Sequence, residues 1–132
     1  MAATKPTAQV RQVQPLLVVS DINRSLEFYC DRLGFEVAGQ AEDNGKVFWC
    51  RLNRGGSSIM LQREEDEDGP AQGRGRGVIL YFVCDDVDAL HADLLSRGLE
   101  LPPPTLAYYG MKQLYVPEPD GYEICFESSV PS

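Results

Sequence analysis

The hydrophobic positions along the chain alternate between short apolar runs and two stripes with helical spacing. Residues 13–19, VQPLLVV, form an apolar run rich in β-branched side chains, which predicts a strand. The first stripe follows directly, with apolar residues three or four positions apart: Ile22, Leu26, Tyr29 and Leu33. This spacing predicts a helix that buries one face. Either Ser20 or Asp21 can cap its first turn, and Gly34 suits the position just after its end.

Three further strands are predicted after this helix. They are the runs FEVAGQ (residues 35–40), KVFWCRL (46–52) and SSIMLQ (57–62). The segments between them, EDNG and NRGG, contain residues that favour tight turns. The next segment, REEDEDGPAQGRGRG, has no apolar periodicity and predicts an exposed linker.

The second half of the chain repeats this pattern. VILYFV (78–83) predicts a strand, Asp85 or Asp86 a helix cap, and Gly98 a helix end. Val87, Leu90 and Leu94 form the second helical stripe. Four later runs complete the predicted strands: LELPPP (99–104), TLAYYG (105–110), MKQLYVP (111–117) and YEICFE (122–127).

The repeat predicts an α+β fold of two tandem βαβββ modules. The two glycines that end the helices, Gly34 and Gly98, are 64 residues apart (98 − 34). We expect one domain over residues 1–132, with module one at about 10–63, the linker at about 64–76 and module two at about 77–128. Because such a module leaves one face of its sheet open, the two curved, mixed sheets should form a cleft between them.

Composition and charge narrow the class of function. The 132 residues carry a formal net charge of −8, which argues against nucleic acid as a partner and is mildly favourable to a cationic one. The chain has neither an apolar stretch long enough to cross a membrane nor a signal-peptide pattern at its start, so we expect no membrane partner and a cytoplasmic location. Four cysteines lie in apolar runs, which predicts reduced core thiols: Cys30, Cys50, Cys84 and Cys125.

Two stretches resemble the signature sequences of a known family. VVSDINRSLEFYCDRLGF and EPDGYEICF are similar to those of the vicinal oxygen chelate superfamily, which includes glyoxalase I, extradiol dioxygenases and bleomycin-resistance proteins. The resemblance extends from about Val13 to Glu127 and includes the internal repeat. It implies the two-module fold, but it does not specify the activity, because the family hosts unrelated chemistries.

The resemblance also implies four metal-ligand positions, one on each of four strands. They fall on Gln14, Met60, Ile79 (or Val78, if Asp85 caps the second helix) and Cys125. A hard divalent ion prefers carboxylate or imidazole ligands, so this set predicts that no metal cofactor is bound. A rebuilt site is the alternative, with Gln14, Gln62 and either Glu123 or Glu127 as ligands.

Strand alternation nominates the residues that line the cleft. It places Tyr122, Ile124 and Phe126 toward the core. The predicted ligand-binding residues are Gln14, Phe48, Met60, Gln62, Ile79, Tyr81, Tyr109, Met111, Gln113, Glu123 and Cys125. Arg51 and Arg63 are expected at solvated strand ends, with an anion-binding role only if one of them points inward. The single histidine, His91, is expected to pack on the second helix.

Two classes of function remain open beside a role in assembly alone. The first is a metal-free binding protein, similar to the bleomycin-resistance group, that holds an organic ligand such as a cationic antibiotic in an aromatic cleft, as a homodimer. The second is a lyase, isomerase or dioxygenase that uses a divalent metal on a substrate with vicinal oxygens. Only the metal-dependent class requires acidic or imidazole ligands that converge in the cleft.

Overall fold

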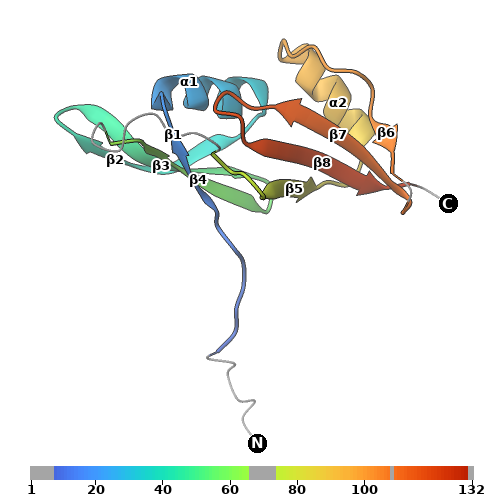
Figure 1. The fold of residues 1–132 in the computed structure, drawn as a ribbon, viewed down its shortest axis with the longest axis horizontal. Helices are drawn as coiled ribbons and strands as arrows, with labels where there is room; N and C mark the ends of the chain where they lie inside the picture. The colour runs from blue at the N-terminus through green and yellow to red at the C-terminus, as the bar shows by residue number, and fades with distance from the viewer. Residues whose placement is uncertain (1–7, 66–73, 108, 131–132) are drawn as a thin grey trace, which may run out of the picture.

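Two four-stranded sheets with the same internal strand order form the body of the molecule, as Figure 1 shows for a computed structural model. The structure describes residues 8–65, 74–107 and 109–130. The first sheet has the order β1-β4-β3-β2 and the second the order β5-β8-β7-β6. Both sheets are mixed, because β1 runs parallel to β4 and β5 runs parallel to β8, while the other pairs are antiparallel. The predicted α+β architecture of two tandem modules is therefore confirmed.

The bounds of the elements follow the predicted order closely. The first module contains β1 (Leu16–Val19), α1 (Ile22–Leu26), the π-helical turn η1 (Glu27–Arg32), β2 (Glu36–Asp43), β3 (Lys46–Arg54) and β4 (Ser57–Arg63). The second contains β5 (Ile79–Val83), α2 (Val87–Ser96), β6 (Thr105–Leu106), β7 (Met111–Pro117) and β8 (Glu123–Ser129). Within the described part of the chain, no helix is long and apolar enough to cross a bilayer.

The helix caps settle two alternatives that the sequence left open. Asp21 caps α1, accepting hydrogen bonds from the backbone N–H groups of Asn23 and Arg24 at 3.1 Å each. Asp86 caps α2 in the same way. Gly34 and Gly98 follow the two helices with φ angles of 75° and 98°, a left-handed conformation that favours glycine.

One predicted strand is wrong. Residues 99–104, LELPPP, form no strand, and only Thr105–Leu106 of the following segment pairs with β7. Proline has no backbone N–H to donate, so three consecutive prolines cannot maintain a ladder of hydrogen bonds. The predicted linker falls largely on residues 66–73, which lie outside the described residues.

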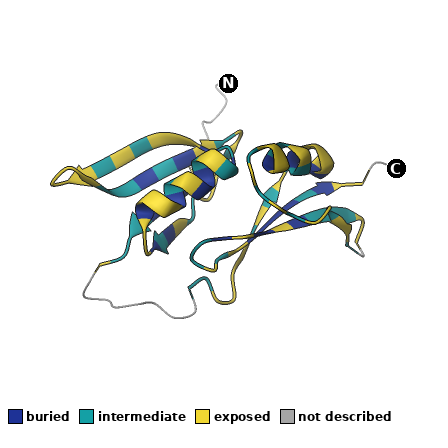
Figure 2. Cartoon of the chain, turned by 90° about the horizontal axis from the view of Figure 1, so that it is seen from above, coloured by how far each residue is buried: buried dark blue, intermediate teal, exposed yellow. Residues whose placement is uncertain are grey.

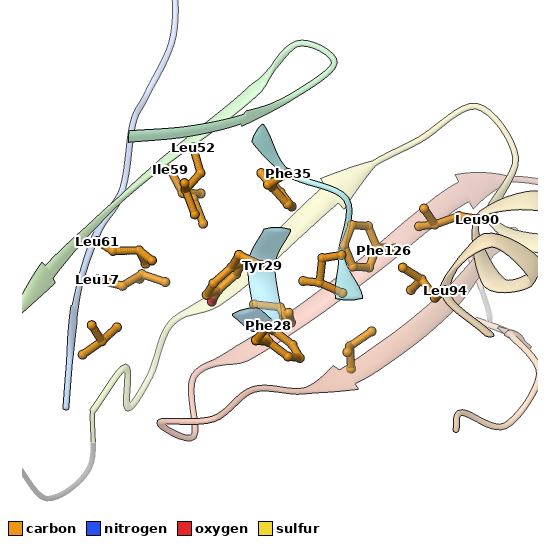
Figure 3. Packing of buried hydrophobic residues seen from close by; sticks show 14 of the residues in the cluster. Leu17, Phe28, Tyr29, Phe35, Leu52, Ile59, Leu61, Leu90, Leu94 and Phe126 are labelled. Carbon is orange, nitrogen blue, oxygen red and sulfur yellow. The ribbon is translucent and has the colours of Figure 1, made fainter. Parts of the chain in front are cut away.

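Both helices cover the same side of the two sheets, as Figures 1 and 2 show. The residues that point toward the helices are buried, for example Leu52 and Ile59 in the first sheet and Ile124 and Phe126 in the second. They belong to one hydrophobic cluster that extends through both modules (Figure 3). The cluster therefore fixes the modules to each other.

Aromatic rings form the centre of this junction. Tyr29 packs edge-on against Phe35, with ring centroids 5.9 Å apart, and Phe35 packs edge-on against Phe82 at 5.7 Å. Phe82 in turn stacks on Phe126 at 5.1 Å. The series starts in the first module and ends in the second, so burial of these rings stabilises the two-module arrangement as well as each module.

A buried polar contact crosses the same junction. The Tyr29 hydroxyl donates a hydrogen bond of 2.8 Å to Oε2 of Glu118, which precedes the β7–β8 turn and is only 8% exposed. Tyr122 donates a second cross-module bond of 2.7 Å to the carbonyl of Val18. Burial raises the pKa of Glu118 despite the bond from Tyr29.

The opposite face of the sheets carries no helix in the described part of the chain. The sheets are not closed around a cavity. They lie side by side and share one open face (Figures 1 and 2). Any site built from the sheets has this face available, because the helices occupy the other one.

Replacing Tyr29 with phenylalanine tests the buried contact. Y29F leaves the Glu118 carboxyl without its donor in a buried place, so we expect the free energy of unfolding to fall by about 1–3 kcal/mol. Urea denaturation followed by circular dichroism measures it. Y115F is the matched control, because it removes an exposed hydroxyl contact that water can replace. Equal stability of Y29F and the wild type would contradict the proposed contribution.

The raised pKa of Glu118 predicts a pH dependence of stability. A carboxyl whose pKa is higher in the folded state binds its proton more tightly there, so its stabilising contribution is complete at low pH. That contribution is lost as the pH rises from the ordinary value of 4.5 through the raised pKa. We expect the wild type to lose stability relative to E118Q as the pH rises through this interval. A difference that does not change with pH would show that burial leaves the carboxyl unperturbed.

Candidate functional site

A cluster of tyrosines occupies the open face of the second sheet. Tyr81 and Tyr115 are the register partners of Cys125 on either side, from β5 and β7. Their hydroxyl oxygens are 3.2 Å apart, and Cys125 is fully buried although it belongs to the open face. The two side chains are about half-exposed, so they present ring surface to solvent while their hydroxyl groups meet.

A carboxylate and an amide continue this cluster one register row further along. Glu127 Oε1 accepts a hydrogen bond of 3.0 Å from Gln113 Nε2 and one of 3.4 Å from the Tyr109 hydroxyl. Gln113 also contacts the Tyr109 hydroxyl directly. We call the set Tyr81, Tyr109, Gln113, Tyr115, Cys125 and Glu127 the tyrosine cluster. The pair Tyr115–Cys125 and the pair Gln113–Glu127 lie two residues apart along β7 and β8, on the same face.

The titratable groups of the cluster favour binding over covalent chemistry. Burial raises the pKa of the Cys125 thiol, so at neutral pH it is a protonated thiol and a poor nucleophile. The hydrogen bond with Tyr81 raises the pKa of Tyr115, and desolvation together with Glu127 raises that of Tyr109. These groups offer aromatic surface and neutral hydroxyls beside one carboxyl group, a combination suited to a basic organic group.

The open face of the first sheet has a different character. Strand alternation places Trp49, Arg51, Met60 and Gln62 there, because the intervening residues of β3 and β4 are buried toward the helices. Arg51 Cζ lies 5.6 Å from the centre of the Trp49 ring. In register, Met60 stands between Leu16 and Arg51, and Gln62 stands between Val18 and Trp49.

The predicted place of Phe48 in the cleft stays a prediction. Phe48 lies where the β2–β3 register shifts, between the pairs Ala41–Trp49 and Glu42–Val47, so alternation does not assign its face; Arg63 Cζ is 6.0 Å from its ring centre. The prediction rested on analogy, without a register for this strand. Trp49 is an aromatic residue that β3 contributes to the open face.

Two hollows lie where the modules meet. The one on the open-face side measures about 390 Å³ and is lined by Val13, Pro15, Ile79 and Tyr81, among others. The other, of about 550 Å³, is lined by Phe35, Phe82, Phe126 and Arg54 of the core side. Arg54 is already engaged there, donating to the Leu33 carbonyl at 2.6 Å and to Asp93 at 3.3 Å. The open-face hollow is therefore the better candidate, since predicted ligand-binding residues line it.

The predicted metal positions do not form a cation site. Gln14 and Met60 belong to the first module, whereas Ile79 and Cys125 lie on the second sheet, where Cys125 is covered by two tyrosines. Among the described residues, no three His, Cys, Asp or Glu side chains come together. The alternative ligands do not converge either, because Glu127 bonds to Gln113 and Glu123 is exposed beside Ile79. These residues do not fit a divalent ion, and we derive no chemistry through one.

The remaining predicted residues have clear places. Met111 shares the open-face side of β7 with Gln113 and Tyr115 by alternation. His91 lies on α2, and its Nε2 is 3.1 Å from the Leu101 carbonyl oxygen, which gives it a structural partner. Tyr115 was not among the predicted site residues. Its place two positions after Gln113 on one strand was the signal that would have found it.

The cover over Cys125 gives a testable prediction. Truncation in Y115A removes one of the two rings above the thiol, so we expect iodoacetamide to label Cys125 about tenfold faster or more. Mass spectrometry of the labelled peptides measures the rate. Cys50 is buried on the helix side and serves as the internal control, because its labelling should not change. If both thiols react faster together, the variant has loosened the whole fold instead.

Comparison with known proteins agrees with this architecture. The Glyoxalase/Bleomycin resistance protein/Dioxygenase superfamily model matches residues 11–126. Uncharacterized protein YraH of Bacillus subtilis (strain 168) is 29% identical over 99 residues, which cover 69% of this chain and 75% of YraH.

Two solved structures are also similar. TnmS3 from Streptomyces sp. CB03234, described as an antibiotic binding protein, has a TM-score of 0.68 at 25% identity, covering 92% of this chain and 98% of TnmS3. A bleomycin resistance determinant encoded on the transposon Tn5 has a TM-score of 0.71 at 21% identity, covering 92% of this chain and all of that one (100%). With its repeated strand order and the match over residues 11–126, the chain belongs to the glyoxalase/bleomycin resistance protein/dioxygenase superfamily.

Proposed function

We propose that this protein binds a small organic ligand through the tyrosine cluster, without a metal cofactor. The observation that carries the proposal is the grouping of three tyrosine side chains with Gln113 and Glu127 on the sheet face that no described helix covers. Exposed aromatic surface beside a carboxyl group suits a ligand that has a ring system and a basic group. A cationic antibiotic has this chemistry, and the similar protein TnmS3 is described as an antibiotic binding protein.

The electrostatics of the chain support a basic ligand. The net charge of −8 attracts cations at long range, and Glu127 provides a local acceptor within the cluster. The thiol of Cys125 contributes no reactive group, because it is buried and its pKa is raised. Retention of the ligand, rather than its conversion, is the function that these side chains can perform.

A second copy of the chain would complete the site under this proposal. Several apolar side chains of the open-face side are exposed, including Val13 at 84%, Leu16 at 42% and Val83 at 72%. Exposed apolar side chains of this kind favour association. We therefore place the ligand between the open faces of a homodimer. The four cysteines are all free, which suits the reducing cytoplasm.

Replacing Glu127 tests the proposed role of its carboxylate. A thermal-shift panel of basic glycopeptide antibiotics, flat aromatic cations, their neutral analogues and divalent ions identifies the ligand class first. E127Q keeps the shape and an acceptor but removes the charge, so we expect roughly tenfold weaker binding of the cationic ligand by calorimetry, about 1.4 kcal/mol. E36Q is the matched control, because Glu36 is an exposed carboxylate at the start of β2 and lies outside the cluster.

Three results would contradict the proposal. They are equal affinity of E127Q and wild type for the cationic ligand, no stabilisation by any organic member of the panel, and stoichiometric binding of a divalent ion that stabilises the protein on its own. The last result would favour the metal-dependent alternative.

A further inference from the structure

The guanidinium of Arg51 has no hydrogen-bond or ion-pair partner among the described residues. Its Nε is buried and forms no hydrogen bond, and no ion pair or hydrogen bond involves its other nitrogens. Other arginines of the chain are engaged with carboxylates, hydroxyls or carbonyls: Arg24, Arg32, Arg54, Arg74 and Arg97. Among the described arginines, Arg51 is the one with a buried nitrogen that lacks a hydrogen-bond partner, and its position on the open-face side places it where a ligand can reach it.

The surroundings of Arg51 form a cavity of about 330 Å³. The cavity is lined by Arg51, Gln12, Gln14, Asn53 and Ser58, with the glycines of the β3–β4 turn at its edge. The Ser58 hydroxyl is also buried without a hydrogen-bond partner. The lining thus combines one fixed positive charge with amide and hydroxyl donors, and it contains no carboxylate.

This arrangement is costly unless an anion completes it. A buried charged or polar group without a partner loses its hydration and gains nothing in return. A guanidinium presents its N–H groups in a planar fork that matches two oxygens of a carboxylate or phosphate. Trp49 supports the flat group from one side at 5.6 Å, which leaves the N–H edges of the guanidinium to a partner.

We propose that the Arg51 cavity is a binding site for an oxyanion, a carboxylate or a phosphate. It joins the apolar hollow at the module junction, because both are lined by Gln12, Gly56, Ser57 and Ser58. A further step rests on the proposed function: the oxyanion is one group of the organic ligand that the tyrosine cluster binds. The ligand then carries an acidic group for Arg51, an apolar portion near Ile79 and Tyr81, and a basic group for Glu127.

The test measures the arginine and its neighbouring tryptophan directly. Sodium acetate and sodium phosphate are titrated against sodium chloride at constant ionic strength. The readouts are the ¹H–¹⁵N signal of Arg51 Nε and the fluorescence of Trp49, which is the only tryptophan of the chain. We expect a saturable change with at least one of the two oxyanions and none with chloride. The oxyanion that binds more tightly identifies the group.

Two variants locate the site. R51M removes the charge and should weaken oxyanion binding tenfold or more, while R51K, which keeps the charge but not the fork, should weaken it less. R63M is the matched control, because Arg63 also lies over an aromatic ring, Phe48, but on the other face. Circular dichroism and the melting temperature confirm that each variant is folded.

The proposal is overturned if acetate and phosphate act no differently from chloride, or if R51M binds the oxyanion as tightly as the wild type. It is also overturned if R51M dissociates a dimer and neither oxyanion binds the wild type, since a partner carboxylate would then be the group that Arg51 meets. Simple anions probe this cavity without the organic ligand, so failure of the E127Q experiment leaves this result unaffected.

Discussion

The arrangement of the molecule depends on the contact between its two modules at Tyr29. This side chain packs against Phe35 in the aromatic series that extends to Phe126, and its hydroxyl bonds to the buried Glu118 of the other module. Apolar burial supplies attraction without direction, whereas the buried hydrogen bond favours one orientation, because any other would leave Oε2 of Glu118 without the Tyr29 donor. The two sheets therefore lie side by side with both helices on one face.

That constraint makes the open face a single surface. In the second sheet it carries the tyrosine cluster, where rings close over the thiol of Cys125. In the first it carries Arg51 in a cavity of amides and hydroxyls. The acidic and basic sites lie on opposite sides of the junction, with apolar residues such as Ile79 between them. The family fold supplies the surface, and the side chains on it determine the chemistry.

The residues at the metal-ligand positions implied by the resemblance include side chains that a hard cation does not prefer. Ile79 and Cys125 stand on neighbouring parallel strands, yet neither offers an ionised oxygen or an imidazole. The carboxylate of Glu127 accepts hydrogen bonds from an amide and a phenol. An organic ligand can use these groups as hydrogen-bond acceptors and aromatic walls, which is the basis of the proposed function.

The sequence alone determined the repeated strand–helix–strand order, the capping residues and the open-face side of β8, because these follow from local spacing, turn residues and alternation. It left the choice between adjacent caps open, and it wrongly predicted a strand at residues 99–104, where consecutive prolines cannot donate to a hydrogen-bonded ladder. Only the tertiary structure decided that Tyr115 joins Tyr81 over Cys125 and that Arg51 Nε is buried without a hydrogen-bond partner. Both depend on the register between strands far apart in the chain, and long-range packing sets that register.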